Sequence, residues 1–145
     1  MTGGQVGGVE TMRMQIGEVA DQVGLSLRTI RFYEEAGLVI PSARSAGGFR
    51  LYSKTDLNRL QLIKRMKPLG FSVEEIGEFL SMLDSLASEK LTVVEREAVM
   101  SGLEDLQRNV DDRIVALVAK VEQAREFALQ LAEMCSAPRT QLDRA

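Results

Sequence analysis

The sequence predicts a mainly α-helical protein in which a domain of short helices and one small hairpin precedes a single long helix. Three observations predict this arrangement. Apolar residues of the first half recur at helical spacing in short blocks that end at glycine or proline. Glycines and alternating residues interrupt these blocks between Val39 and Tyr52. From Val99 to Cys135, apolar residues recur every three or four positions, as in a coiled coil.

The composition is that of an ordinary globular protein. The 145 residues are 45% hydrophobic and 27% charged, enough for one core with an appended element. No apolar run approaches the roughly 18 residues of a membrane-spanning helix, and no basic stretch precedes an apolar one, so we expect a cytoplasmic protein without membrane contact. One cysteine and no histidine exclude a disulfide framework and argue against a metal cage. We therefore expect neither cofactor nor metal.

Charge is divided unevenly along the chain. The overall net charge is -3, but residues 14–70 hold nine Lys or Arg against five Asp or Glu, whereas residues 71–145 hold eight against fifteen. The basic half is therefore the candidate for contact with phosphates.

Two short helices are expected at the start of the basic half. Apolar residues from Ile16 to Val23 lie on one helical face, and Gly24 ends that helix. Ser26 is a suitable N-cap for a second helix that Gly37 ends. Two short helices joined by a tight turn form a helix-turn-helix, here between about Ile16 and Glu35.

The hairpin over residues 39–52 is followed by two more short helices. Ser53 caps a helix that runs through Lys67, and Pro68 and Gly70 then break it. Ser72 and Glu75 form a capping box at the start of the next helix. The first domain therefore spans residues 14–83, behind a glycine-rich leader at 1–13 that we expect to be disordered.

A long helix is expected over residues 95–135, after a polar linker at 84–94 and before a short flexible tail at 136–145. At 1.5 Å per residue it would be about 60 Å long, and the small domain before it cannot cover its apolar stripe. A second copy is the simplest partner for that stripe. The steps along it include one four-residue stutter near Val110 to Ile114. The predicted dimerisation residues are Leu103, Leu106, Val110, Ile114, Leu117, Val121, Ala124, Ala128 and Leu131.

The second helix of a helix-turn-helix enters the major groove, and its exposed face offers donors to bases and phosphates. We expect Arg28, Thr29, Arg31 and Tyr33 to form that face. The alternative is that the two arginines pair with nearby acids such as Glu34 or Glu35.

The hairpin can act as a wing, because glycine lets the backbone approach a phosphate closely. Its candidate DNA-binding residues are Arg44, Gly48, Phe49, Arg50 and Tyr52. The alternative is an ordinary surface turn. Lys64 and Lys67 add positive charge near the end of the following helix, where they could instead complement its dipole.

Several ordered motifs between Met14 and Leu83 closely resemble the MerR family of bacterial regulators. They are IGEVA at 16–20, SLRTIRFYEEAGL at 26–38, GFRLY at 48–52 and LGFSVEEI at 69–76. The resemblance implies a winged helix-turn-helix and a homodimer joined by an antiparallel coiled coil. It also implies binding to a pseudo-palindromic promoter element, distortion of that DNA and RNA polymerase as a partner. Carried over by position, the family's DNA contacts fall on Arg28, Arg31, Tyr33, Arg44, Phe49, Arg50, Tyr52 and Lys67, with Phe49 standing where tyrosine is common.

The signal to which the protein responds is less well indicated. Metal-sensing relatives carry two or more cysteines near the coiled coil, whereas this sequence has only Cys135. Drug-sensing relatives append a large domain, whereas about ten residues follow the long helix here. Cys135 is a candidate redox or electrophile sensor, or simply a small apolar residue that completes the seam.

Two other interpretations of the sequence are a protein of a different binding class and an enzyme. A coiled-coil interaction or architectural protein with weak DNA binding remains the alternative. An enzyme is not expected, because the sequence has no histidine and no nucleophile beside a base.

Overall fold

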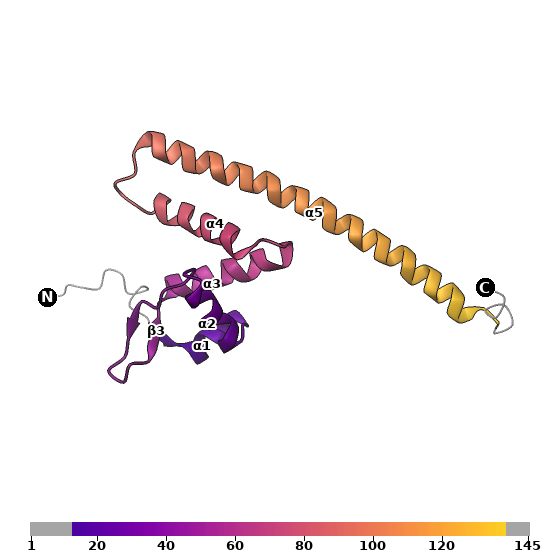
Figure 1. Cartoon of the computed structure of the whole chain (residues 1–145), viewed down its shortest axis with the longest axis horizontal. Coiled ribbons are helices and arrows are strands. Elements are labelled where there is room, and N and C mark those ends of the chain that lie inside the picture. Colours follow the sequence, from indigo (N-terminus) through magenta and orange to yellow (C-terminus); the bar gives the residue numbers. More distant parts are fainter. Residues whose placement is uncertain (1–12, 139–145) are drawn as a thin grey trace. The chain divides into compact units, whose positions relative to one another are not determined.

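The computed structural model describes residues 13–138 (Figure 1). The expected leader, apart from residue 13, and the part of the expected tail after residue 138 lie outside the described residues. The chain divides into two compact units, Met1–Leu103 and Glu104–Ala145. The first contains all the short elements, and the second contains most of the long helix.

The first two helices confirm the predicted helix-turn-helix. Helix α1 (Ile16–Val23) ends at Gly24, whose φ of 78° is left-handed and whose N–H donates to the carbonyl of Ala20 at 2.8 Å. Helix α2 (Leu27–Glu35) begins after Ser26, whose hydroxyl accepts a hydrogen bond from the Thr29 N–H at 3.1 Å. Such a cap stabilises a helix by about 1 kcal/mol. The two helices pack together through their buried apolar side chains.

The wing belongs to a small antiparallel sheet with one more strand than predicted. Strands β2 (Ala43–Arg44) and β3 (Arg50–Tyr52) form the expected hairpin, and β1 (Met14–Gln15) pairs with the other edge of β3. The register places Met14 opposite Tyr52 and Arg44 opposite Arg50. A two-residue strand is too short to show alternation in a sequence, so β1 was missed. Its consequence is that β3 is the central strand.

Three further elements complete the core of the first unit. Helix α3 (Lys54–Met66) starts at a capping box of Ser53 and Asp56, and leads into the 3-10 turn η1 (Lys67–Leu69). Helix α4 (Val73–Leu86) starts at the capping box that the sequence predicts, Ser72 with Glu75. The core that these elements share includes Leu60, Ile63, Phe71, Ile76 and Leu80, all nearly inaccessible to solvent.

The long helix α5 (Val93–Ser136) confirms the expected C-terminal element but begins two residues early. Thr92 and Glu95 explain the difference: the Thr92 hydroxyl accepts from the Glu95 N–H at 3.1 Å, and the Thr92 N–H donates to the Glu95 carboxylate at 2.9 Å. This reciprocal cap fixes the start of the helix. Helix α4 in turn continues past residue 83 to Leu86, so the connection between the two helices is shorter than the predicted linker.

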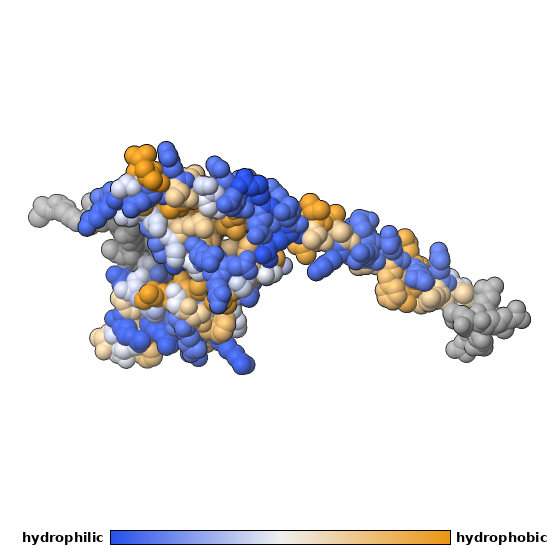
Figure 2. Space-filling view, turned by 45° about the horizontal axis from the view of Figure 1, so that its top comes forward, coloured by the Kyte–Doolittle hydropathy of each residue, from blue (hydrophilic) through white to orange (hydrophobic). Residues whose placement is uncertain are grey.

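The apolar stripe of α5 is open to solvent in the single chain. No residue of α5 is buried, and Ile114, Leu117, Val121 and Leu131 are 38–47% exposed. Apolar side chains are visible at the surface along this helix (Figure 2). None of the helices in the described range is long and apolar enough to cross a membrane.

Candidate nucleic-acid interface

Helix α2 presents a basic outer face. Arg28 and Arg31, which are three positions apart and therefore neighbours on the helix surface, are both exposed. Ile30, on the opposite side, is fully buried and anchors the helix in the core. Within residues 13–138, neither arginine forms an ion pair with Glu34 or Glu35, so the alternative of local surface pairs is not what the structure shows. Both guanidinium groups are available to an external anion.

Thr29 and Tyr33 are placed differently from these arginines. Thr29 is half-buried, and its hydroxyl accepts from the Ser26 hydroxyl at 2.8 Å, so it supports the start of α2. Tyr33 is only 5% exposed, and the expectation that it lies on the outer face is wrong. It follows Ile30 by three residues and therefore shares the buried face. Burial raises the pKa of Tyr33 above its usual value.

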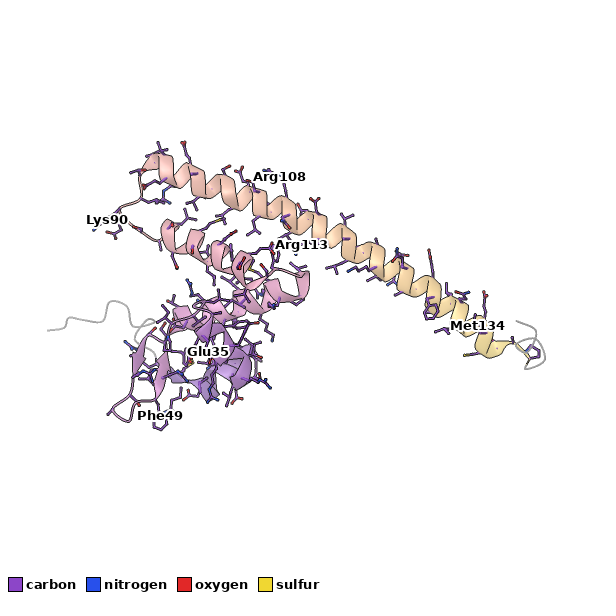
Figure 3. All side chains as sticks on the ribbon, viewed as in Figure 1. Glu35, Phe49, Lys90, Arg108, Arg113 and Met134 are labelled. Atoms are coloured by element: carbon purple, nitrogen blue, oxygen red, sulfur yellow. The ribbon has the colours of Figure 1, made fainter. Side chains whose placement is uncertain are left out.

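The wing tip is exposed and carries both charge and an aromatic ring. Phe49 is 63% exposed at the hairpin, where Figure 3 labels it. Gly48 has a φ of 83°, which a residue with a Cβ rarely adopts. The Arg44 guanidinium donates to the Gly48 carbonyl at 3.0 Å and so braces the tip. The tip is thus an ordered projection with a cation at its base.

Glu34 joins the wing to α2. Arg50 Nε lies 3.1 Å from Glu34 Oε2, and the Tyr52 hydroxyl donates to Glu34 Oε1. Arg50 and Tyr52 are two residues apart in β3 and so project from the same face of the sheet. The Glu34 side chain is only 8% exposed, whereas that of Arg50 is 39% exposed. One carboxylate on the recognition helix therefore holds two side chains of the central wing strand.

Tyr52, which the sequence predicts as a DNA-binding residue beside the wing, has no surface to offer to DNA. Its side chain is fully buried, because β3 packs against α1 and α3, and its hydroxyl reaches Glu34 on α2. Burial, together with the hydrogen bond to Glu34, raises the pKa of Tyr52 well above its usual value. The hydroxyl thus stays protonated as the donor to Glu34.

A small concavity lies between α2 and the wing. Its volume is about 160 Å³, and three arginines from three different elements line it. Converging guanidinium groups with glycine backbone beside them suit a phosphate. The lining residues are Gln15, Ile16, Arg31, Arg44, Gly48, Phe49 and Arg50.

The two lysines after the wing have separate surroundings. Lys64 Nζ donates to the carbonyl of Val23 at 2.7 Å, so its charge lies at the C-terminus of α1, where a cation is favoured. Lys67 is exposed at the junction of α3 and η1. The structure therefore leaves Lys67 free for a phosphate but gives Lys64 a structural role within the helix-turn-helix.

Cys135 is exposed near the C-terminal end of α5. In the described part of the chain, no three His, Cys, Asp or Glu side chains are grouped so that they could hold a metal ion.

Glu34 is the residue between α2 and the wing whose contacts the sequence does not predict. The sequence offers Glu34 only as a partner for Arg28 or Arg31 on its own helix. One signal in the sequence could have indicated this contact. Arg50 and Tyr52 are two residues apart in a strand, so their side chains share one face and could bind the same carboxylate.

Comparison with known proteins assigns the family. The model described as MerR HTH family regulatory protein matches residues 14–83, and the model described as MerR, DNA binding, matches residues 57–119. The mercuric resistance operon regulatory protein of Bacillus cereus is 37% identical over 102 residues, which cover 67% of this chain and 77% of that protein. The chain belongs to the MerR family of transcriptional regulators.

Solved MerR structures agree with this fold. A MerR family transcriptional regulator from Bacillus cereus has a TM-score of 0.61 and 28% identity over 85% of this chain and 80% of that chain. HiNmlR, a MerR family regulator lacking the sensor domain and solved bound to promoter DNA, has a TM-score of 0.62, with 24% identity over 83% of this chain and 85% of that chain. As a member of the MerR family, the protein is a transcription regulator with a DNA-binding domain and not an enzyme.

Proposed function

We propose that this MerR regulator binds a pseudo-palindromic promoter element as a homodimer and controls transcription by distorting the promoter DNA. The observation that carries the proposal is the basic outer face of α2 beside an exposed wing, with Arg28, Arg31 and Arg44 all accessible. Such a surface fits a duplex whose major groove receives α2 and whose backbone passes along the wing.

The open apolar stripe on α5 supports the proposed dimer. Apolar side chains that are 38–47% exposed along a helix without a single buried residue need a partner surface. The seam residues Leu103 to Leu131 recur at coiled-coil spacing, and a second copy offers the same stripe. Pairing with the second α5 in antiparallel orientation is two-fold symmetric, as a pseudo-palindromic site requires.

Individual residues are proposed to contact different parts of the DNA. Arg28 reads base edges, because a guanidinium in the major groove can bind guanine with two hydrogen bonds. Arg31, Arg44 and Arg50 contact phosphate at the concavity between α2 and the wing. Lys67 contacts phosphate further along the backbone. Phe49, at the wing tip, packs against a sugar or widens the adjacent groove.

RNA polymerase is the proposed protein partner at the promoter. Two recognition helices carried by one dimer favour a particular separation of the half-sites, and the energy of distorting the DNA to that separation depends on the sequence between them. HiNmlR, which shares the fold, was solved on promoter DNA. Because a bacterial promoter lies in the cytoplasm, the proposal includes a cytoplasmic location.

Cys135 is the proposed effector residue. Its thiol is exposed at the far end of the helix that we assign to dimerisation, so an electrophile that adds to it would place a bulky group beside the seam. Transcription assays with and without N-ethylmaleimide test this assignment in the wild type and in Cys135→Ser. A response that persists in the variant would exclude the thiol as the sensor.

Binding itself is tested by selecting duplexes from a random pool with the full-length protein. We expect a selected sequence with two related half-sites, bound by two protomers in sedimentation experiments. Selection without a dyad, or binding by a single protomer, would contradict the proposal.

A further inference from the structure

We propose that Glu34 is a positioning residue that sets DNA specificity by fixing the wing against the recognition helix. The inference rests on the proposed DNA-binding function and adds to it a residue that touches no DNA. Its basis is the juxtaposition of one nearly buried carboxylate on α2 with Arg50 and Tyr52 on β3.

The location of Glu34 is unfavourable on two counts. It lies in the last turn of α2, where the helix dipole disfavours an acid. It also lies beside a surface whose ligand is a polyanion, so its negative charge opposes binding. The contacts with Arg50 and Tyr52 offset both costs, which indicates that the value of Glu34 lies in the geometry that they impose.

That geometry extends from β3 to the whole wing. Strand β3 is central, with β1 on one edge and β2 on the other. Glu34 therefore fixes the strand to which the other two are hydrogen-bonded, including Arg44 opposite Arg50. Two points of attachment, one from Arg50 and one from Tyr52, restrict both sliding and rotation of this sheet against α2.

Glu34 also orients Arg50 and leaves most of its hydrogen-bond donors available to DNA. Nε faces Glu34 Oε2, and the two terminal nitrogens of the guanidinium carry four further donors. A phosphate in the concavity that Arg31, Arg44 and Arg50 share can use these donors. An arginine held in place loses less side-chain entropy on binding than a free one.

Attachment of the wing to α2 should affect specific and non-specific DNA binding differently. Non-specific binding depends mainly on the number of cations near the backbone, whereas specific binding needs the bases and the phosphates contacted in one fixed register. Loss of the Glu34 carboxylate should therefore reduce the ratio of specific to non-specific affinity, roughly tenfold if one charged interaction of about 1.4 kcal/mol is lost.

Glu35→Gln is the matched control for Glu34→Gln. Glu35 is the next residue of α2, is exposed and carries the same charge, and Figure 3 labels it. Both variants remove one negative charge from the same helix end, so they raise non-specific affinity alike. Affinities of the full-length protein for a duplex selected by the wild type and for a random-sequence duplex of equal length give the ratio for each variant.

We expect the ratio to fall roughly tenfold for Glu34→Gln and to stay at the wild-type value for Glu35→Gln. Tyr52→Phe, which removes only the hydroxyl and keeps the buried ring, should lower the ratio in the same direction and covers the case in which Glu34→Gln fails to fold. Equal ratios for Glu34→Gln and Glu35→Gln, or a wild-type ratio for Tyr52→Phe, would overturn the inference. A wild-type protein that prefers no duplex would instead refute the proposed function.

Discussion

Glu34 Oε2 and Arg50 Nε lie 3.1 Å apart, so the recognition helix and the central strand of the wing share one ion pair. Arg50 is the more exposed partner and also lines the concavity between these elements. The same side chain thus serves the fold on one side and is available to a phosphate on the other. This dual position distinguishes Arg50 from Arg28, which has no partner among the described residues.

Arg50→Ala and Arg28→Ala should therefore weaken DNA binding in different ways. Arg50→Ala is expected to lower affinity for all sequences and to reduce the slope of log affinity against log salt by about 1. Because it also removes one attachment of Glu34 to β3, it should in addition lower the ratio of specific to non-specific affinity. Arg28→Ala should cost about 1–3 kcal/mol on the preferred site and relax discrimination at one position of each half-site. Fluorescence anisotropy at several salt concentrations measures both effects. Equal losses on specific and random duplexes for Arg28→Ala would refute its role as a base reader.

Tyr52 predicts a pH dependence of folding stability. Because its pKa in the folded protein is raised above the ordinary value of 10.0, the folded state holds its proton where the unfolded state loses it. The stabilisation is therefore fully present below about pH 10 and declines as pH rises further toward the folded pKa. Urea unfolding between pH 8 and pH 11 should show a steeper alkaline decline for the wild type than for Tyr52→Phe. Parallel declines would show that Tyr52 does not carry this effect.

Gly24 should tolerate substitution poorly. Its φ of 78° costs an alanine roughly 1–2 kcal/mol, and a Cβ there would lie 2.7 Å from Lys64 Nζ, which binds the Val23 carbonyl. We expect Gly24→Ala to lower the free energy of unfolding by at least that strain. Gly17→Ala is the control, since a Cβ at Gly17 has nothing within 4 Å and should be neutral or stabilising. Chemical denaturation measures the free energy of unfolding of both variants. Equal values for the two would contradict the strain assigned to a side chain at Gly24.

Leu117 tests the dimerisation seam. A glutamate there would place a charge in the proposed interface between two α5 helices, so Leu117→Glu should yield monomers in sedimentation velocity. Val115→Glu is the control, because Val115 lies two positions away on nearly the opposite face and is 69% exposed. It should remain a dimer. A dimeric Leu117→Glu would show that the seam is assigned to the wrong face.

Local signals allowed most of the fold to be predicted. Helix ends are marked in the sequence by residues that act locally. Gly24 ends a helix through its backbone geometry, and short-range hydrogen bonds start helices at Ser26, Ser53 and Ser72. The predicted start of α5 at residue 95 is two residues late, because the capping box of Thr92 and Glu95 sets the first turn of the helix.

The site was less predictable because its assembly is tertiary. Tyr33 and Tyr52 have side chains typical of DNA contact, yet each is turned inward by the face that its element buries. The pairing of Glu34 with β3 depends on how the hairpin is placed by the helices it packs against, which no local spacing encodes. The surface positions of three arginines were easier to predict, because a charged side chain is rarely buried. These arginines are Arg28, Arg31 and Arg44.

The central claim is that two copies of α2 read one DNA duplex from a single two-fold dimer. Hydroxyl-radical footprinting of the duplex selected by the full-length protein tests it most directly. We predict two protected backbone clusters related by a dyad and separated by about one helical turn or a multiple of it. A single protected cluster, or no protection at low salt, would contradict the account.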